Sequence, residues 1–335
     1  MPNATLPPEI FDIIIGHAQD DTGRPVSLQK RNVQRFVHLF THPLSTIRPH
    51  IRCLEILGSS SVRGSDSFDS DWLDPFIGAL ASLPSVNEML LQNIVWGRMN
   101  PSTRSALLVG FQALAHLEVR AAQFDSVTHL VQLVSSKPLL QILSVDDLGW
   151  EDASFDPAQR VSGALHSLRL SNCYKRDILD WLASHDPLPR ISHIQLGSVY
   201  PEDTHSIGRF LRRLGPHLSI LQLEFSSLDA GGDAEDFCAR VDLAHNSNLR
   251  TLILDKFINY SEYQFSSAVG WIPELLSRTP NLREASFGGG DSRLAGAASA
   301  GRPNRLARPR QSVQLPSSAS AIADTAVLDF RHGRA

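Results

Sequence analysis

The chain is poor in the features that cross-link small folds or cross membranes. It has only three cysteines among 335 residues, Cys53, Cys173 and Cys238, an odd number without a C-x-x-C pair. This usage excludes a disulfide framework and a zinc finger and is typical of a reducing compartment. No apolar run approaches the ~18 residues of a membrane span, and the N-terminus lacks the pattern of a signal peptide. We therefore expect a protein of the cytoplasm or the nucleus with reduced thiols.

Positive and negative charges are distributed unevenly along the chain. The formal net charge is −4, yet residues 288–335 carry seven Arg against three Asp, a net +4, which leaves −8 for residues 1–287. An acidic main part argues against a nucleic-acid partner. The 42% hydrophobic content is that of a globular protein. Because 335 residues exceed most single cores, we expect two domains or one repeat array.

An apolar triplet with the spacing Leu-x-x-Leu-x-Leu recurs nine times, and its first members lie 25 to 35 residues apart. The last two members alternate with polar residues, which predicts a short strand with its apolar side chains on one face. The triplets are Ile51-Leu54-Ile56, Val86-Met89-Leu91, Leu114-Leu117-Val119, Leu140-Leu143-Val145, Leu165-Leu168-Leu170, Ile191-Ile194-Leu196, Leu218-Leu221-Leu223, Leu249-Leu252-Leu254 and Leu282-Ala285-Phe287.

Segments with helical spacing lie between the triplets, for example residues 177–184, 207–214 and 269–278. Many end in Pro or Asn just before the next triplet, where Pro stops a helix. Strand and helix repeated at this period predict an α/β solenoid, with a curved parallel sheet inside and helices outside. An ordinary doubly wound sheet with variable connections is the alternative.

The period and the triplet resemble those of leucine-rich repeats, over residues 47–287 and about nine irregular repeats. The turn is less similar. The family commonly has Asn or Cys three residues after the last triplet member, and only the segment LHSLRLSNC, residues 165–173, fits fully. The resemblance therefore implies a diverged array.

The opening stretch LPPEIFDIII precedes the array, and its apolar residues share one helical face. The order Leu-Pro-x-Glu-Ile-x-x-Ile-Ile resembles the start of the F-box, a helical module that docks the Skp adaptor of a cullin-type ubiquitin ligase. Residues 36–57 are similar to the junction in the F-box-like leucine-rich-repeat proteins of mushroom-forming fungi. The resemblance implies that the adaptor-binding residues are Leu6, Pro7, Pro8, Glu9, Ile10, Ile13 and Ile14.

The second half of the F-box is missing. Its Val-Cys-x-x-Trp segment is replaced by DDTGRPVSLQKRNVQRF, residues 20–36, and the first Cys and Trp are Cys53 and Trp72. Residues 1–46 are thus predicted to be a truncated F-box-like helical segment and linker. The alternative is a helix that caps the open end of the array and binds no adaptor.

The sequence contains no constellation that predicts catalysis. His38 and His42 lack the Glu of an H-E-x-x-H motif and a third ligand. The acidic stretch at residues 65–72 lacks the Gly and Glu of a calcium loop and is expected to be an exposed loop, and FGGGD at 287–291 lacks the Lys of a phosphate loop. We expect no enzyme, no metal site and no cofactor.

Protein binding on the concave strand face is the expected function. The resemblance to F-box leucine-rich-repeat proteins implies a substrate-recognition subunit of a ubiquitin ligase; the alternative is a leucine-rich-repeat scaffold without a ligase role. The mixed composition of the face suits a protein ligand. The candidate substrate-binding residues are Glu55, Glu88, His116, Glu118, Ile142, Ser144, Arg169, His193, Gln195, Ile220, Gln222 and Ile253, with Thr251 and Glu284 on the same face.

The periodicity stops at about residue 288. Residues 288–335 are dominated by Gly, Ala, Ser, Arg and Pro, which cannot form a core, and are predicted to be a disordered tail. A basic arm that binds an acidic partner is the alternative. A shifted or unspliced reading frame would explain both this tail and the missing half of the F-box.

We expect limited proteolysis to cut first between residues 288 and 310, because the Gly, Ala and Arg residues there have no predicted packing partners. Mass spectrometry of the early fragments measures the order of cleavage. Protection of this segment while sites between residues 47 and 287 are cut would show that the tail is folded or bound.

Overall fold

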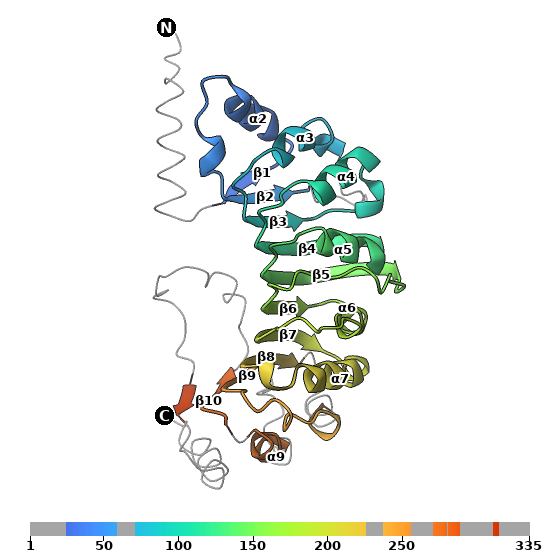
Figure 1. Ribbon diagram of the computed structural model, residues 1–335, viewed down its shortest axis with the longest axis vertical. Helices are drawn as coiled ribbons and strands as arrows, with labels where there is room; N and C mark the ends of the chain where they lie inside the picture. Colours follow the sequence, from blue (N-terminus) through green and yellow to red (C-terminus); the bar gives the residue numbers. More distant parts are fainter. Residues whose placement is uncertain are drawn as a thin grey trace, which may run out of the picture. The chain divides into compact units, whose positions relative to one another are not determined.

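The structure is a computed structural model, and it forms two compact units, Met1–Leu165 and His166–Ala335. Both units belong to the α/β class, because each combines parallel strands with connecting helices (Figure 1). The described residues are 25–58, 71–225, 237–255, 271–279, 281–288 and 311–314.

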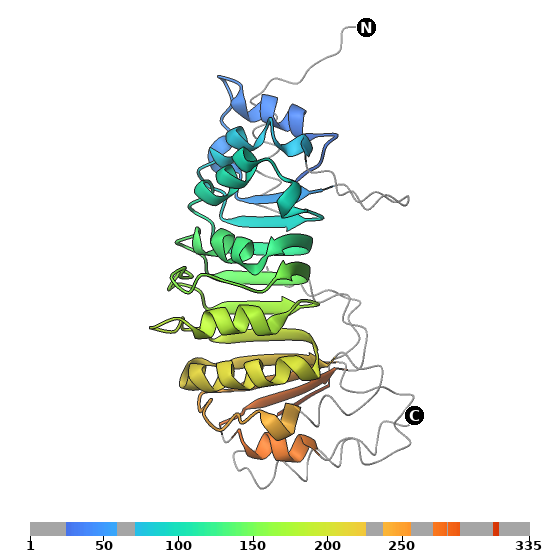
Figure 2. The ribbon, with the colours of Figure 1, turned by 90° about the vertical axis from the view of Figure 1, so that its right-hand side faces the viewer.

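The first unit contains β1 (Val26–Leu28), α2 (Val33–Thr41), η1 (Arg48–His50), β2 (Cys53–Leu57), η2 (Asp71–Leu73), α3 (Ile77–Ala81), β3 (Glu88–Gln92), η3 (Trp96–Arg98), α4 (Pro101–Val109), β4 (His116–Ser126), α5 (Val127–Ser135) and β5 (Ile142–Asp152). Each strand from β1 to β4 pairs in parallel with the next strand along the chain. Helices α3, α4 and α5 lie on one side of these strands, which Figure 2 shows from the helical side.

The second unit contains β6 (Ser167–Ser171), α6 (Lys175–Ala183), β7 (His193–Val199), η4 (Pro201–Asp203), α7 (Thr204–Leu214), η5 (Gly215–His217), β8 (Ile220–Phe225), β9 (Thr251–Asp255), α9 (Trp271–Ser277), β10 (Glu284–Gly288) and β11 (Gln311–Gln314). Strands β6 to β10 pair in parallel in chain order, and β11 is antiparallel to β10. Helices α6 and α7 lie side by side on one side of the strands (Figure 2).

The apolar triplets form the core of both units. In all nine, the first member lies two residues before a strand from β2 to β10, and the other two alternate within that strand. The middle members are in register, as Leu54 with Met89 in the first unit and Leu168 with Ile194 in the second. Every described triplet side chain is at most 6% exposed. Since burial of one such side chain contributes about 1.5–3 kcal/mol, this repeated contact is the main source of stability. The predicted parallel α/β arrangement is confirmed.

A left-handed residue lies within or directly after each strand from β3 to β7. It lies two positions after the last triplet member and has φ between 46° and 55°. This conformation is costly for most side chains and is tolerated best by Asn and Asp. These residues are Asn93, Ala121, Asp147, Asn172 and Ser198.

The left-handed residue turns the following side chain into the core. This is the position where leucine-rich repeats commonly have Asn or Cys, and all five side chains are at most 8% exposed. Apolar residues therefore occupy a position that is buried in every one of these turns. They are Ile94, Ala122, Leu148, Cys173 and Val199.

Side chains from neighbouring repeats bind the C-terminal carbonyl groups of the helices. Lys137 is 1% exposed, and its Nζ lies 2.5 Å from Leu107 O, 3.0 Å from Leu108 O and 2.8 Å from Gly110 O, at the end of α4. These carbonyls lack helical donors and form the negative end of the helix dipole, so a buried cation stabilises them. Four other side chains donate hydrogen bonds to backbone carbonyl groups in the same way. They are Arg48 to Ser82, Arg213 to Ala183 and His185, Asn246 to Leu211 and Gly215, and Arg278 to Cys238 and Val241.

Strand pairing begins before the predicted start of the array at residue 47. Strand β1 lies within residues 1–46, for which the sequence predicts a helical segment and linker. Its Leu28 pairs with Ile56 of β2 and is 1% exposed. Three residues are too few for a periodic signal, so the pairing partner decides their conformation. Residues 65–70 of the acidic stretch, which is expected to be an exposed loop, lie outside the described residues. Asp71 is exposed, whereas Trp72 is in η2 and only 8% exposed, so the expected loop does not extend to Trp72.

Two further segments differ from the predictions. Residues 153–166 form no helix between β5 and β6, since Pro157 and Gly163 interrupt a segment without apolar periodicity. Residues 311–314, in the tail that was predicted to be disordered, form β11, and Val313 pairs with the buried Ala285. The last parallel strand offers unpaired backbone groups to such a segment. Residues 289–310 and 315–335 lie outside the described residues.

We expect Lys137→Met to lower the free energy of unfolding by about 1–3 kcal/mol, because three carbonyl groups lose their donor. Burial lowers the pKa of Lys137 to about 8, from 10.5 in the unfolded chain. The unfolded protein therefore binds more protons than the folded one between these values, and the stability advantage of the wild type over Lys137→Met should grow as pH rises from about 8 to about 10.5. Urea unfolding of both proteins at several pH values measures this difference in the free energy of unfolding. The exposed Lys30→Met is the control, and a pH-independent difference would contradict the prediction.

Candidate functional site

The side chains that alternate with the triplets lie on the strand surface opposite the helices, because successive side chains of a strand point to opposite faces. The first-unit strand face consists of Cys53, Glu55, Leu57, Glu88, Leu90, Gln92, His116, Glu118, Arg120, Ile142 and Ser144. The second-unit strand face consists of Ser167, Arg169, His193, Gln195, Ile220, Gln222, Thr251, Ile253, Glu284 and Ser286. Each predicted substrate-binding residue is on one of these two faces.

Several members of the faces were missed from the sequence. Cys53 has the same register position as Glu88, and Leu90 pairs with both Glu55 and Glu118. In the run EMLLQ, Leu90 stands between the inward-pointing Met89 and Leu91, so it looks like a core residue. Counting alternate residues from the triplet would have identified its position as outward. Ser144, a predicted binding residue, is only 8% exposed, because its short side chain lies below those of longer neighbours.

Three carboxylates surround the Cys53 thiol on the first-unit strand face. Partial burial, the charges of Glu88, Glu55 and Glu118, and a side-chain hydrogen bond to Glu88 together raise the pKa of Cys53 to about 12, with burial as the largest cause. A neutral thiol at the centre of negative charge is a poor nucleophile. This part of the face is therefore suited to electrostatic binding rather than to thiol chemistry.

Two of these carboxylates already have partners. Arg120 Nη2 forms an ion pair with Glu118 Oε1, and the two side chains are 37% and 21% exposed. The Ser27 hydroxyl of β1 donates a hydrogen bond to Glu55. Strand β1 therefore positions one of the acidic side chains, and Glu88 remains the exposed one.

The described second-unit strand face carries one carboxylate, that of Glu284, one permanent cation, Arg169, and a histidine pair. The rings of His166 and His193 meet edge to face with centroids 6.4 Å apart, and Ser192 Oγ lies 2.9 Å from His193 Nδ1. Burial lowers the pKa of His193, and His166 and Arg169 lower it further. Beside them, Gln222 Nε2 donates to Asp255 Oδ2 at 2.5 Å. This face is polar and carries little charge near neutral pH.

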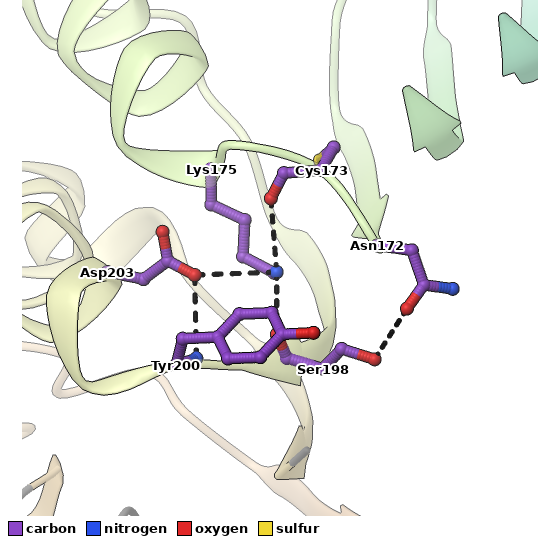
Figure 3. Close-up of polar contacts among 6 residues, drawn as sticks. All are labelled: Asn172, Cys173, Lys175, Ser198, Tyr200 and Asp203. Carbon is purple, nitrogen blue, oxygen red and sulfur yellow. Dashed lines mark hydrogen bonds and ion pairs between the residues drawn. The ribbon is translucent and has the colours of Figure 1, made fainter. Parts of the chain in front are cut away.

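A buried lysine joins two strand-end turns in the second unit (Figure 3). Lys175 is 0% exposed, and its Nζ lies 2.8 Å from Ser198 O and 3.5 Å from Asp203 Oδ2. The Tyr200 ring covers it, with its centroid 5.5 Å from Nζ. Burial raises the pKa of Asp203, while the charge of Lys175 lowers it. Because the amine is enclosed and fully coordinated, its role is to hold the turns after β6 and β7 together.

The metal and catalytic candidates do not converge. Within the described ranges, no three His, Cys, Asp or Glu side chains are close enough to hold a metal ion. His38 lies in α2, and His42 follows the helix, with its Nδ1 accepting a hydrogen bond from the Leu44 amide at 3.3 Å. The residues expected to bind an adaptor, Leu6 to Ile14, lie outside the described residues.

Comparison with known proteins does not identify the chain. No protein-family model matches it, and no curated protein matches it. In the part of the chain that the structure describes, no helix is long and apolar enough to cross a membrane.

We expect Cys53 to react with iodoacetamide roughly 1000-fold more slowly near pH 8 in the folded protein than in the unfolded chain, since its pKa is about 12 instead of 9. Glu88→Gln removes the largest single charge contribution and should accelerate alkylation, whereas Glu151→Gln, at an exposed position of β5, should not. Mass spectrometry of the Cys53 peptide measures the rate. Alkylation at the rate of the unfolded chain would contradict this electrostatic description.

Proposed function

We propose that the protein is a non-enzymatic, protein-binding leucine-rich-repeat protein, and that it serves as the substrate-recognition subunit of a cullin-type ubiquitin ligase in the cytoplasm or nucleus. The observation that carries the repeat part is the register of the triplets. Nine strands begin two residues after the first triplet member, and the middle members pair in both units. In arrays of this kind each repeat contributes one strand, and the strands of neighbouring repeats form a shared surface.

The strand faces support a protein ligand. They combine carboxylates, histidines, amides and half-buried aliphatic side chains such as Leu90, Ile142 and Ile220. Such a mixture resembles a protein interface, with apolar contacts and a polar surround, rather than the basic surface that nucleic acid requires. The substrate is therefore proposed to lie on the strands.

The ligase part of the proposal rests on the sequence LPPEIFDIII at residues 6–15, which resembles the first helix of the F-box. In this proposal Leu6, Ile10 and Ile14 contact the Skp-type adaptor of the ligase. The repeat array would then hold the substrate while the opening segment attaches the protein to the ligase.

A repeat scaffold without a ligase role is the second candidate, and one structural observation favours it. The segment in place of the second F-box helix includes β1, whose Leu28 is buried against the strand ladder. Val33 of α2 is also 1% exposed. These residues contribute to the core of the repeat unit and are therefore not free to complete a separate F-box core.

We expect Ile10→Asp/Ile14→Asp to abolish co-purification with a co-expressed Skp-type adaptor and to leave the melting temperature unchanged, because the docking face would lie outside the repeat core. Asp12→Asn, off the apolar face, is the matched control. If the opening helix instead caps the array, the double variant should lose several kcal/mol of stability, since unpaired buried charges are costly. Absence of adaptor binding by the wild type, with a large loss of stability in the variant, would refute the ligase role and leave the scaffold.

A further inference from the structure

The first-unit strand face places one aliphatic side chain between two carboxylates. Glu55, Leu90 and Glu118 occupy paired positions on β2, β3 and β4. Neighbouring strands are about 4.8 Å apart, so the two glutamate backbones are separated by about 10 Å with Leu90 between them. Glu88 lies two residues before Leu90 on the same strand and is therefore on the same face, about 7 Å away along β3.

Negative charge on this part of the face exceeds positive charge. Its nine outward positions on β2, β3 and the first five residues of β4 include three glutamates and one permanent cation, Arg120. Arg120 pairs with Glu118, and Glu55 accepts a hydrogen bond from a neutral hydroxyl. Glu88 is exposed, and its register partners on β2 and β4 are Cys53 and His116. Two net negative charges remain beside the half-buried Leu90.

An inorganic cation does not suit this arrangement. Calcium and magnesium need oxygen ligands that converge within about 2.0–2.6 Å of one point, and carboxylates on alternate strands do not converge in this way. A long organic cation fits better, because Lys and Arg place an aliphatic stem on apolar surface and keep the charged head in a polar environment. The guanidinium also forms forked hydrogen bonds with carboxylates.

We propose that the first-unit strand face binds a cationic, extended segment of a partner protein, with a Lys or Arg stem on Leu90 and its head among Glu55, Glu88 and Glu118. The inference rests on the proposed function in that it takes the partner to be the bound substrate. Charge complementarity selects this partner over acidic proteins and nucleic acids, which the same carboxylates would repel. Partners that expose a basic segment are thus the substrate class.

The experiment is fluorescence anisotropy of the full chain with labelled Ala-Ala-Arg-Ala-Lys-Ala-amide. The comparison peptides replace Arg and Lys by Gln, or by the short-stemmed cation diaminopropionic acid. We expect binding of the Arg/Lys peptide that weakens from about 50 mM to about 300 mM salt, no binding of the Gln peptide, and weaker binding of the short-stemmed one.

Variants locate the site. Glu88→Gln should weaken binding about threefold, as expected for one exposed charge pair, and Glu55→Gln/Glu118→Gln should weaken it at least tenfold. Glu151→Gln and Glu202→Gln, at exposed positions elsewhere, are the controls and should bind as the wild type does. Melting temperatures are measured for all variants, and the exposed Glu88→Gln keeps the test valid if the double variant does not fold.

The inference would be overturned by equal binding of the Gln peptide, or by unchanged affinity in Glu88→Gln and in a folded double variant. Failure to bind the Arg/Lys peptide would do the same. The readout is independent of adaptor co-purification. A protein that binds the adaptor but not the peptide would refute this inference alone, and one that binds the peptide but not the adaptor would refute the ligase role alone.

Discussion

The register of the parallel strands is the constraint on which the other features of the protein depend. If one strand slipped by a single residue, its buried triplet side chains would be exchanged with the polar ones on the opposite surface. Pairs such as Leu117 with Leu143 and Leu221 with Leu252 oppose such a shift, because every neighbour in the unit has an apolar side chain at the same level. The composition of both strand faces follows from that alignment. The acidic character of one face and the histidine pair on the other are thus set by residues spaced about one repeat apart in the sequence.

The two strand faces differ because burial affects their ionisable groups differently. In the first unit, burial and three carboxylates keep Cys53 protonated, so the face stays negative without a reactive thiol. In the second unit, burial favours the neutral form of His193, and Arg169 disfavours a second positive charge. The first-unit face is therefore suited to electrostatic contacts, and the second-unit face is suited to hydrogen bonds.

The strands were predictable because the signal is local and repeated: Leu165, Leu168 and Leu170 lie within six residues, and the same pattern returns in each repeat. The left-handed turns were missed, although Asn93, Asp147 and Asn172 are residue types that favour this conformation. The strand face was only partly predictable, since Leu90 looks like a core residue until the register is known. The contacts of Lys137 and Lys175 could not be predicted. Their partners include backbone carbonyls 23 to 30 residues away, which have no signature in the sequence.

From α4 onward the capping contacts couple each repeat to its neighbour in one direction, whereas α3 is capped from the N-terminal side by Arg48. The carbonyl ends of α4, α6 and α7 are held by Lys137, Arg213 and Asn246, which all come from later in the chain. A helix of nine residues is marginal by itself, so α4 and α6 become stable only when the following repeat is in place. In a nearest-neighbour description of folding, the interface terms then exceed the intrinsic terms. For α4, α6 and α7, fraying is expected to spread from the C-terminal side toward the N-terminal side, because loss of the following repeat uncaps the helix before it.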